Sequence, residues 1–169
     1  MNTIDTLVIV DADSKCNHLN ERKIKESGIS NNVKVTLNGG HALLYLNQIS
    51  HKTVCSKTVV ILNMDTPIAN GFDFLEGLKY SNEIYKDNVL VVVVNDNLDE
   101  NKLEKTKKLG VNHFISSGLC TDSLKNLISE YFNSNTSKVN STASITAQIN
   151  KNPEGNLNNK RKKVNIITK

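Results

Sequence analysis

The chain has 169 residues, which is room for one domain of ordinary size with some excess. It is 38% hydrophobic with a formal net charge of +4, and no stretch approaches the roughly 18 apolar residues that a membrane span needs. The N-terminus lacks a charged segment followed by a long apolar core. The sequence therefore predicts neither a membrane protein nor a secreted one, and it favours the cytoplasm.

The positive charge is confined to one end of the chain. Residues 1–133 have a net charge of −2, whereas residues 134–169 carry +6 and include the basic run Lys160 to Lys163. No aromatic residue interleaves with this run, so it offers no stacking platform for nucleic acid, and contact with nucleic acid is disfavoured. The three cysteines are widely spaced and odd in number, which argues against a disulfide framework or a zinc site.

Strand-like and helix-like segments alternate along the first 133 residues. In chain order we expect a strand at 6–10, a helix from 14 to 27 capped by Asp13 or Ser14, a strand at 33–35, a helix at 42–49, a strand at 59–62, a helix at 72–78, a strand at 89–94, a helix at 98–109, a strand at 113–115 and a helix at 124–132. The continuous apolar runs are typical of strands that are covered on both faces.

This alternation predicts an α/β fold of the flavodoxin-like, doubly wound type, with five parallel strands and helices on both faces of the sheet. In such folds the functional site lies beyond the carboxyl ends of the strands. Residues 1–133 form the predicted domain. Residues 134–169 are rich in Asn, Ser and Lys and are predicted to be a disordered tail, because they cannot bury enough apolar surface to offset the entropy of ordering.

The residues that follow the strands resemble a known family. Asp11, Ala12 and Asp13 follow the first strand; Asn63, Pro67 and Gly71 follow the third; Asn95 follows the fourth; and Phe114 to Leu119 form the last strand and the turn after it. This order resembles the receiver domain of two-component response regulators over residues 4–133. The resemblance implies phosphoryl transfer from a histidine kinase to an aspartate, aided by Mg²⁺ on a pair of acids and by a lysine.

Four of the five chemical positions of that family are altered in this chain. Asp11 matches the first acid of the pair, but Ala12 stands at the second and Asn63 stands at the phosphoacceptor. Asn95 replaces the hydroxyl residue, and Ser117 replaces the lysine. An amide carries no negative charge and is a very poor nucleophile. The sequence therefore predicts a pseudo-receiver, not an enzyme, that needs no cofactor and acts by binding another protein.

Two other interpretations stay open at this point. In the first, Asp11, Asp13 and Asp65 form a displaced acidic site that holds Mg²⁺ and still accepts a phosphoryl group. Against it, Asp13 stands where a helix cap is expected. The second interpretation is a small-ligand domain on the same scaffold, and the absence of a Gly-rich loop after the first strand disfavours it.

The resemblance also implies a surface for partners, made by the fourth helix, the fifth strand and the fifth helix. In this sequence it includes Lys105, Lys108, Phe114 and Leu119, together with Lys102 and Lys107. The expected partner is a signalling protein, either a histidine kinase or another regulator, and no membrane contact is expected.

Overall fold

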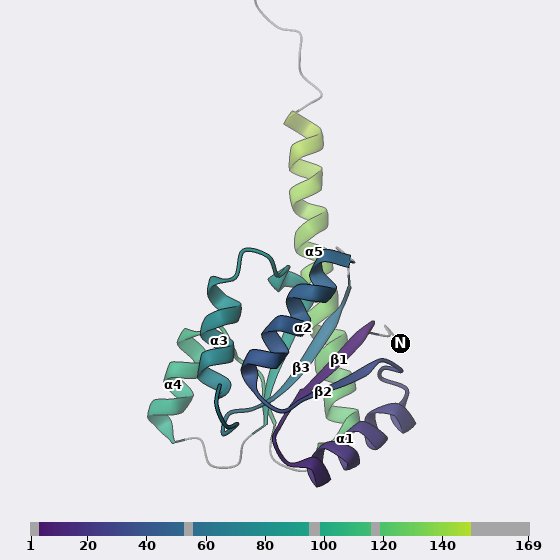
Figure 1. Ribbon diagram of the computed structural model, residues 1–169. Coiled ribbons are helices and arrows are strands. Elements are labelled where there is room, and N and C mark those ends of the chain that lie inside the picture. The colour runs from purple at the N-terminus through teal and green to yellow at the C-terminus, as the bar shows by residue number, and fades with distance from the viewer. Residues whose placement is uncertain (1–3, 53–55, 95–98, 116–118, 150–169) are drawn as a thin grey trace, which may run out of the picture. The chain divides into compact units, whose positions relative to one another are not determined.

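Five parallel strands form one sheet in the computed structural model, in the order β2-β1-β3-β4-β5 (Figure 1). The structure describes residues 4–52, 56–94, 99–115 and 119–149, with side chains described up to residue 135 except that of Lys52. The strands are β1 (Thr6–Val10), β2 (Val33–Thr36), β3 (Thr58–Asn63), β4 (Val89–Val94) and β5 (Phe114–Ile115). Each pairs in parallel with its neighbours, which confirms the doubly wound sheet that the alternation predicted.

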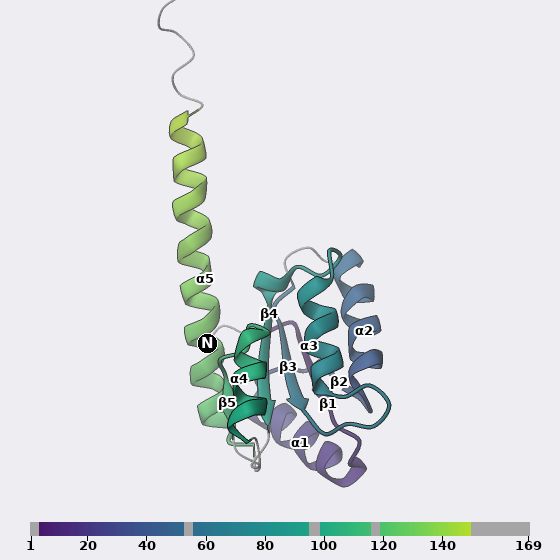
Figure 2. The same ribbon diagram turned by 90° about the vertical axis from the view of Figure 1, so that its left-hand side faces the viewer.

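Helices cover both faces of the sheet. They are α1 (Ser14–Ser27), α2 (Gly39–Lys52), α3 (Gly71–Tyr80), α4 (Glu100–Lys108) and α5 (Thr121–Ile149), with a short 3₁₀ helix η1 (Lys86–Asn88) before β4. Figure 2 shows α2 and α3 together on one side of the sheet and α5 on the other. None of the described helices is both long and apolar enough to span a membrane.

Alternation along β1 divides the apolar core into two layers. Val8 and Val10 point into the layer shared with α2 and α3, whereas Leu7 and Ile9 point into the layer shared with α1 and α5. All four side chains are at most 1% exposed. The two faces of a strand bury different neighbours because successive side chains point to opposite sides of the sheet.

The last helix is longer than its apolar face predicted. The sequence led us to expect a helix that ends near Phe132 and no regular structure after it, whereas α5 continues to Ile149. No Gly or Pro occurs between residues 133 and 149, so no residue there stops helix propagation. The chain divides into two compact units, Met1–Asn135 and Thr136–Lys169. The disorder expected for residues 150–169 lies outside the described residues.

Candidate functional site

Asp11 and Asn63 lie side by side at the carboxyl edge of the sheet. Val10 of β1 pairs with Leu62 of β3, so the residue that follows each of them occupies the same level of neighbouring parallel strands. Both side chains are half-buried. Asn63, which aligns with the phosphoacceptor in the resemblance, therefore lies next to Asp11, which aligns with a metal-binding acid.

The two side chains make the same local hydrogen bond. Oδ1 of Asp11 accepts from the backbone N–H of Asp13 at 3.0 Å, and Oδ1 of Asn63 accepts from the backbone N–H of Asp65 at 3.0 Å. Asp and Asn commonly bond the backbone two residues on in this way, which mimics a backbone turn. One oxygen of each side chain is thus used to shape the loop that leaves its strand.

Asp13 caps α1. Its carboxylate accepts hydrogen bonds from the backbone N–H groups of Lys15 at 2.8 Å and Cys16 at 3.2 Å. These bonds, the one from Cys16 first, lower the pKa of Asp13 below its ordinary value. The capping role that the sequence predicted for Asp13 is confirmed, and it directs this carboxylate toward its own helix.

The displaced acidic site is not assembled. Within residues 4–52, 56–94, 99–115 and 119–149, no three His, Cys, Asp or Glu side chains are grouped so that they could hold a metal ion. Asp11, Asp13 and Asp65 are therefore not grouped as metal ligands there, and the capping bonds engage one oxygen of Asp13. Mg²⁺ requires several oxygen ligands in near-octahedral geometry, and the side chain of Ala12 supplies none. Metal binding by the three acids stays a prediction.

Two altered positions lie outside the described residues. Asn95 directly follows Val94, which pairs with Asn63, and Ser117 follows β5. Their predicted roles, as replacements for a hydroxyl and a lysine, stay predictions.

A strained turn follows Asn63 in the loop between β3 and α3. The backbone N–H of Ala69 donates to the carbonyl of Pro67 at 2.8 Å, which closes a γ-turn around Ile68. Ile68 has a φ of 69° and is 97% exposed. A positive φ is strained for a β-branched residue, and this form of γ-turn is the rarer one. The loop holds a large apolar side chain in solvent at a backbone cost.

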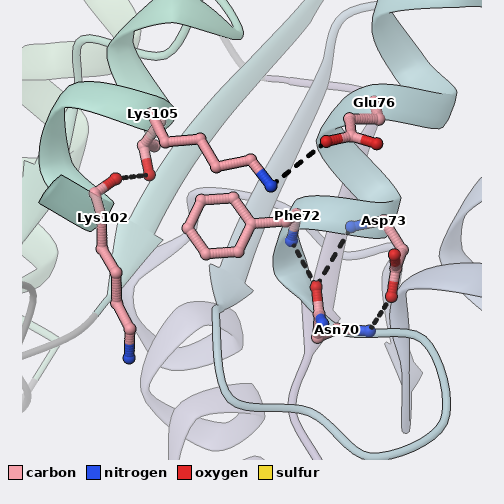
Figure 3. Close-up of polar contacts among 7 residues, drawn as sticks. Asn70, Phe72, Asp73, Glu76, Lys102 and Lys105 are labelled. Atoms are coloured by element: carbon pink, nitrogen blue, oxygen red, sulfur yellow. Dashed lines mark hydrogen bonds and ion pairs between the residues drawn. The ribbon is translucent and has the colours of Figure 1, made fainter.

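Close backbone approach fixes the end of the same loop. The N–H of Gly71 donates to the carbonyl of Met64 at 3.0 Å. A Cβ at Gly71 would lie 2.6 Å from the sulfur of Met64 and 2.8 Å from its Cα, so only glycine fits. Asn70 and Asp73 then form a capping box that begins α3 (Figure 3).

Lys105 connects α4 to α3. Its ammonium lies 3.3 Å from a carboxylate oxygen of Glu76 and 4.3 Å from the centre of the Phe72 ring. Figure 3 shows the Lys105 side chain passing over Phe72 toward Glu76, while Lys102 extends in another direction. The sequence placed Lys105 on the partner surface, but its charged group is engaged within the domain.

Leu119 of the predicted partner surface is not exposed. Its side chain is only 4% exposed and packs in the core layer shared with α1 and α5, so little of it is accessible, and its contact with a partner stays a prediction. Phe114 is half-buried against the other layer. Lys108 is exposed and pairs with Glu104 at 2.8 Å. The exposed cations of α4 besides Lys105 are Lys102, Lys107 and Lys108.

Two features of this edge escaped sequence reasoning. The buried Asn17 donates from its side chain to the carbonyl of Asp11 at 2.8 Å and so fixes the exit of β1. A shallow groove of about 430 Å³ brings Lys102 of α4 to the same depression as Asp65. Contacts between side chains so far apart in the chain leave no periodic signal, although Asn within the first turn of a helix could have been noted.

No family model matches the chain, and no curated protein matches it in sequence. Solved structures do. A two-component response regulator from Cytophaga hutchinsonii is 21% identical, with a TM-score of 0.67 over 78% of this chain and 99% of that one. A response regulator receiver protein from Dyadobacter fermentans is 19% identical, with a TM-score of 0.66 over 75% and 97%.

A third structure is the receiver domain of a sensor histidine kinase from Pseudomonas aeruginosa, solved with a magnesium ion in its active-site cleft. It is 11% identical, with a TM-score of 0.60 over 78% of this chain and 99% of that one. At these identities the likeness concerns the fold. Residues up to about 135 therefore have the receiver fold, as the strand-end residues predicted.

Proposed function

We propose that this chain is a receiver-like signalling protein that binds a protein partner without being phosphorylated on an aspartate. The observation that carries the proposal is Asn63 at the end of β3, with its side-chain oxygen bound to the N–H of Asp65. The receiver fold gives this position to the residue that accepts the phosphoryl group. A neutral amide cannot attack phosphorus effectively. The chain would therefore have the receiver fold without its ability to accept a phosphoryl group at residue 63.

The neighbouring positions support the same proposal. Ala12 follows Asp11 where a second metal ligand would be needed, and a methyl group cannot ligate a cation. Catalysis of phosphoryl transfer depends on positioning and on charge neutralisation by the metal. Without a carboxylate at residue 63 or 12, the edge of the sheet has neither the nucleophile nor the paired acids.

The contact with the partner is assigned to the exposed side of α4. Lys102 and Lys107 are exposed there, whereas Lys105 is held by α3. An acidic surface on a histidine kinase or on another regulator would complement these lysines. Affinity capture from the source cell with the double variant Lys102→Glu, Lys107→Glu should lose the partner, and Lys34→Glu on β2 is the matched control at the opposite edge of the sheet.

Intact mass spectrometry after incubation with acetyl phosphate and Mg²⁺ tests the phosphorylation claim. The wild-type chain should keep its mass. The double variant Ala12→Asp, Asn63→Asp is the positive control, since it restores the nucleophile and the second acid, and it should gain the mass of one phosphoryl group. A stable adduct on the wild-type chain, located at Asp65, Asp11 or Asp13, would refute the proposal and support the displaced acidic site.

A further inference from the structure

The outer edge of β4 is open over one residue. β5 pairs only with Val93 and Val94, and the N–H of Val93 donates to the carbonyl of His113 at 2.9 Å. Alternate residues of a strand direct their N–H and C=O groups to the same side, so those of Val91 also face the side of β5. Among the described residues, none forms a hydrogen bond with Val91 on that side.

The edge is closed on either side of Val91. Below it, the N–H of Val89 donates to Lys86, and its carbonyl accepts a hydrogen bond from the Tyr131 hydroxyl at 3.2 Å. Above it, β5 occupies the edge from Val93 onward. The opening therefore presents one donor and one acceptor, which is too short for a partner strand and matches a single residue of a ligand.

A groove of about 400 Å³ lies against this opening. One part of its wall is apolar, with Leu75 and Leu78 from α3, Val91 from β4, and Leu109 and Val111 from the turn after α4, and the rest is polar. Small-molecule sites are typically concave, mostly apolar and of this size, with a few convergent polar groups that orient the ligand. The groove is therefore large enough for a small organic molecule with an apolar body.

Cations outnumber anions around the groove. It is lined by Lys79, Lys86 and Lys108 and by a single acid, Asp87. The ammonium groups of Lys79 and Lys86 each donate to a backbone carbonyl at the end of a neighbouring helix, which fixes them at the rim. Each ammonium has three donors, so two of them stay available for a ligand. An anionic group would be favoured at this rim.

We propose that this groove binds an N-acyl amino acid whose acyl chain is apolar. The ligand's N–H would donate to the carbonyl of Val91, and its carboxylate would accept from the N–H of Val91, as two residues do in an antiparallel pair. The carboxylate would then lie in the groove that Lys79, Lys86 and Lys108 also line, and a charge-assisted hydrogen bond to a lysine is roughly twice as strong as a neutral one. The acyl chain fills the apolar part of the groove.

This site is separate from the proposed function. Val91 lies below the carboxyl edge of the sheet, where Asp11 and Asn63 lie. The groove needs neither a phosphoacceptor nor a protein partner, so failure of one proposal leaves the other standing.

Titration of the full chain with N-octanoylglycine, followed by calorimetry and by amide NMR, tests the proposal. We expect saturable binding of one ligand per chain and shifts at the amides of Val91 and Val111. The methyl ester, which lacks the charge, and octanoate, which lacks the N–H, should each bind about tenfold more weakly, the ratio that 1.4 kcal/mol gives. Absence of saturation, or equal binding of the ester, would overturn the assignment.

Variants locate the site. Asn112→Trp changes an exposed residue of the lining to a side chain that fills the groove, and it should abolish binding. Lys86→Gln should weaken binding severalfold. This milder substitution tests the site even if Asn112→Trp misfolds. Lys34→Gln removes a lysine on β2, at the opposite edge of the sheet and outside this groove, and should leave the affinity unchanged. Binding that survives both groove substitutions would place the ligand elsewhere.

Discussion

Replacing the strained isoleucine in the loop after β3 should stabilise the protein. Ile68 has a φ of 69° in its γ-turn and is 97% exposed. The substitution Ile68→Gly therefore loses almost no buried apolar surface, and it removes the clash that a Cβ makes at positive φ. The hydrogen bonds that hold the turn, from Ala69 to Pro67 and from Thr66 to Ala69, involve neighbouring residues and are kept.

Two opposing terms set the size of the gain. A non-glycine residue held at such a φ costs about 1–3 kcal/mol. Glycine raises the conformational entropy of the unfolded chain, which costs about 0.5–1 kcal/mol. The difference leaves a net stabilisation of about 1 kcal/mol, and in a domain of this size that raises Tm by about 4 °C.

Urea denaturation followed by circular dichroism measures the effect, with Ile68→Ala as the matched control. Alanine removes the exposed side chain but keeps a Cβ, so its stability should stay within about 0.5 kcal/mol of the wild type. If alanine stabilised as much as glycine, the gain would come from removing an exposed apolar group. If glycine gave no gain, the assignment of backbone strain to Ile68 would be refuted.

Three further predictions concern the helices. Lys105→Met should destabilise the domain by about 1 kcal/mol, because it removes both the cation–π contact with Phe72 and a partly exposed ion pair with Glu76. The control Lys107→Met, on the same helix, should leave the urea denaturation midpoint unchanged. Equal losses of stability in the two variants would count against a stabilising contact between Lys105 and α3. Cys120 should be alkylated faster than Cys16 near neutral pH, because hydrogen bonds with Ser123 lower the pKa of Cys120 while the hydrogen bond to Asp13 raises that of Cys16. Peptide mapping after brief iodoacetamide treatment compares the two rates. Equal rates would contradict the expected difference in thiol pKa. The folded-state pKa of Asp13 is lowered, so the stability that its charge contributes is present above its ordinary pKa and is lost as the pH falls through the folded value. Asp13→Asn should therefore be less stable than the wild type at neutral pH, and the difference in unfolding free energy should disappear in acid. A difference that stays constant across the pH range in urea titrations would exclude this linkage.

The fold could be predicted because short segments of the sequence indicate each helix and strand. The run from Thr6 to Val10 is continuously apolar, which indicates a strand covered on both faces, and Asp13 stands where a helix cap is expected. Positions on the sheet then follow from topology alone. The adjacency of Asp11 and Asn63 needed only the rule that parallel strands end at one edge.

The surfaces could not be predicted in the same way. Lys105 reads as a solvated lysine on a polar helix, and nothing in its neighbourhood in the chain indicates that it reaches Phe72 on α3. Leu119 stands just after a short strand, and its burial depends on how α1 and α5 close over it. Which side of an element faces a neighbour is decided by packing between distant segments, and a period within one element does not contain that information.

At the carboxyl edge of the sheet, the hydrogen bonds that shape the loops do not depend on negative charge. Asn63 still supplies the oxygen that accepts the N–H of Asp65, so the loop needs no carboxylate to keep its turn. What the amide omits is the negative charge, and Ala12 omits a second one beside Asp11. Clustered carboxylates repel one another until a cation or a lysine compensates. Under the proposed function, the two missing acids leave less negative charge for a metal and a lysine to offset, so each loss reduces the need for the others. In that case the edge would keep the same charge at all times and would present a constant surface to a partner.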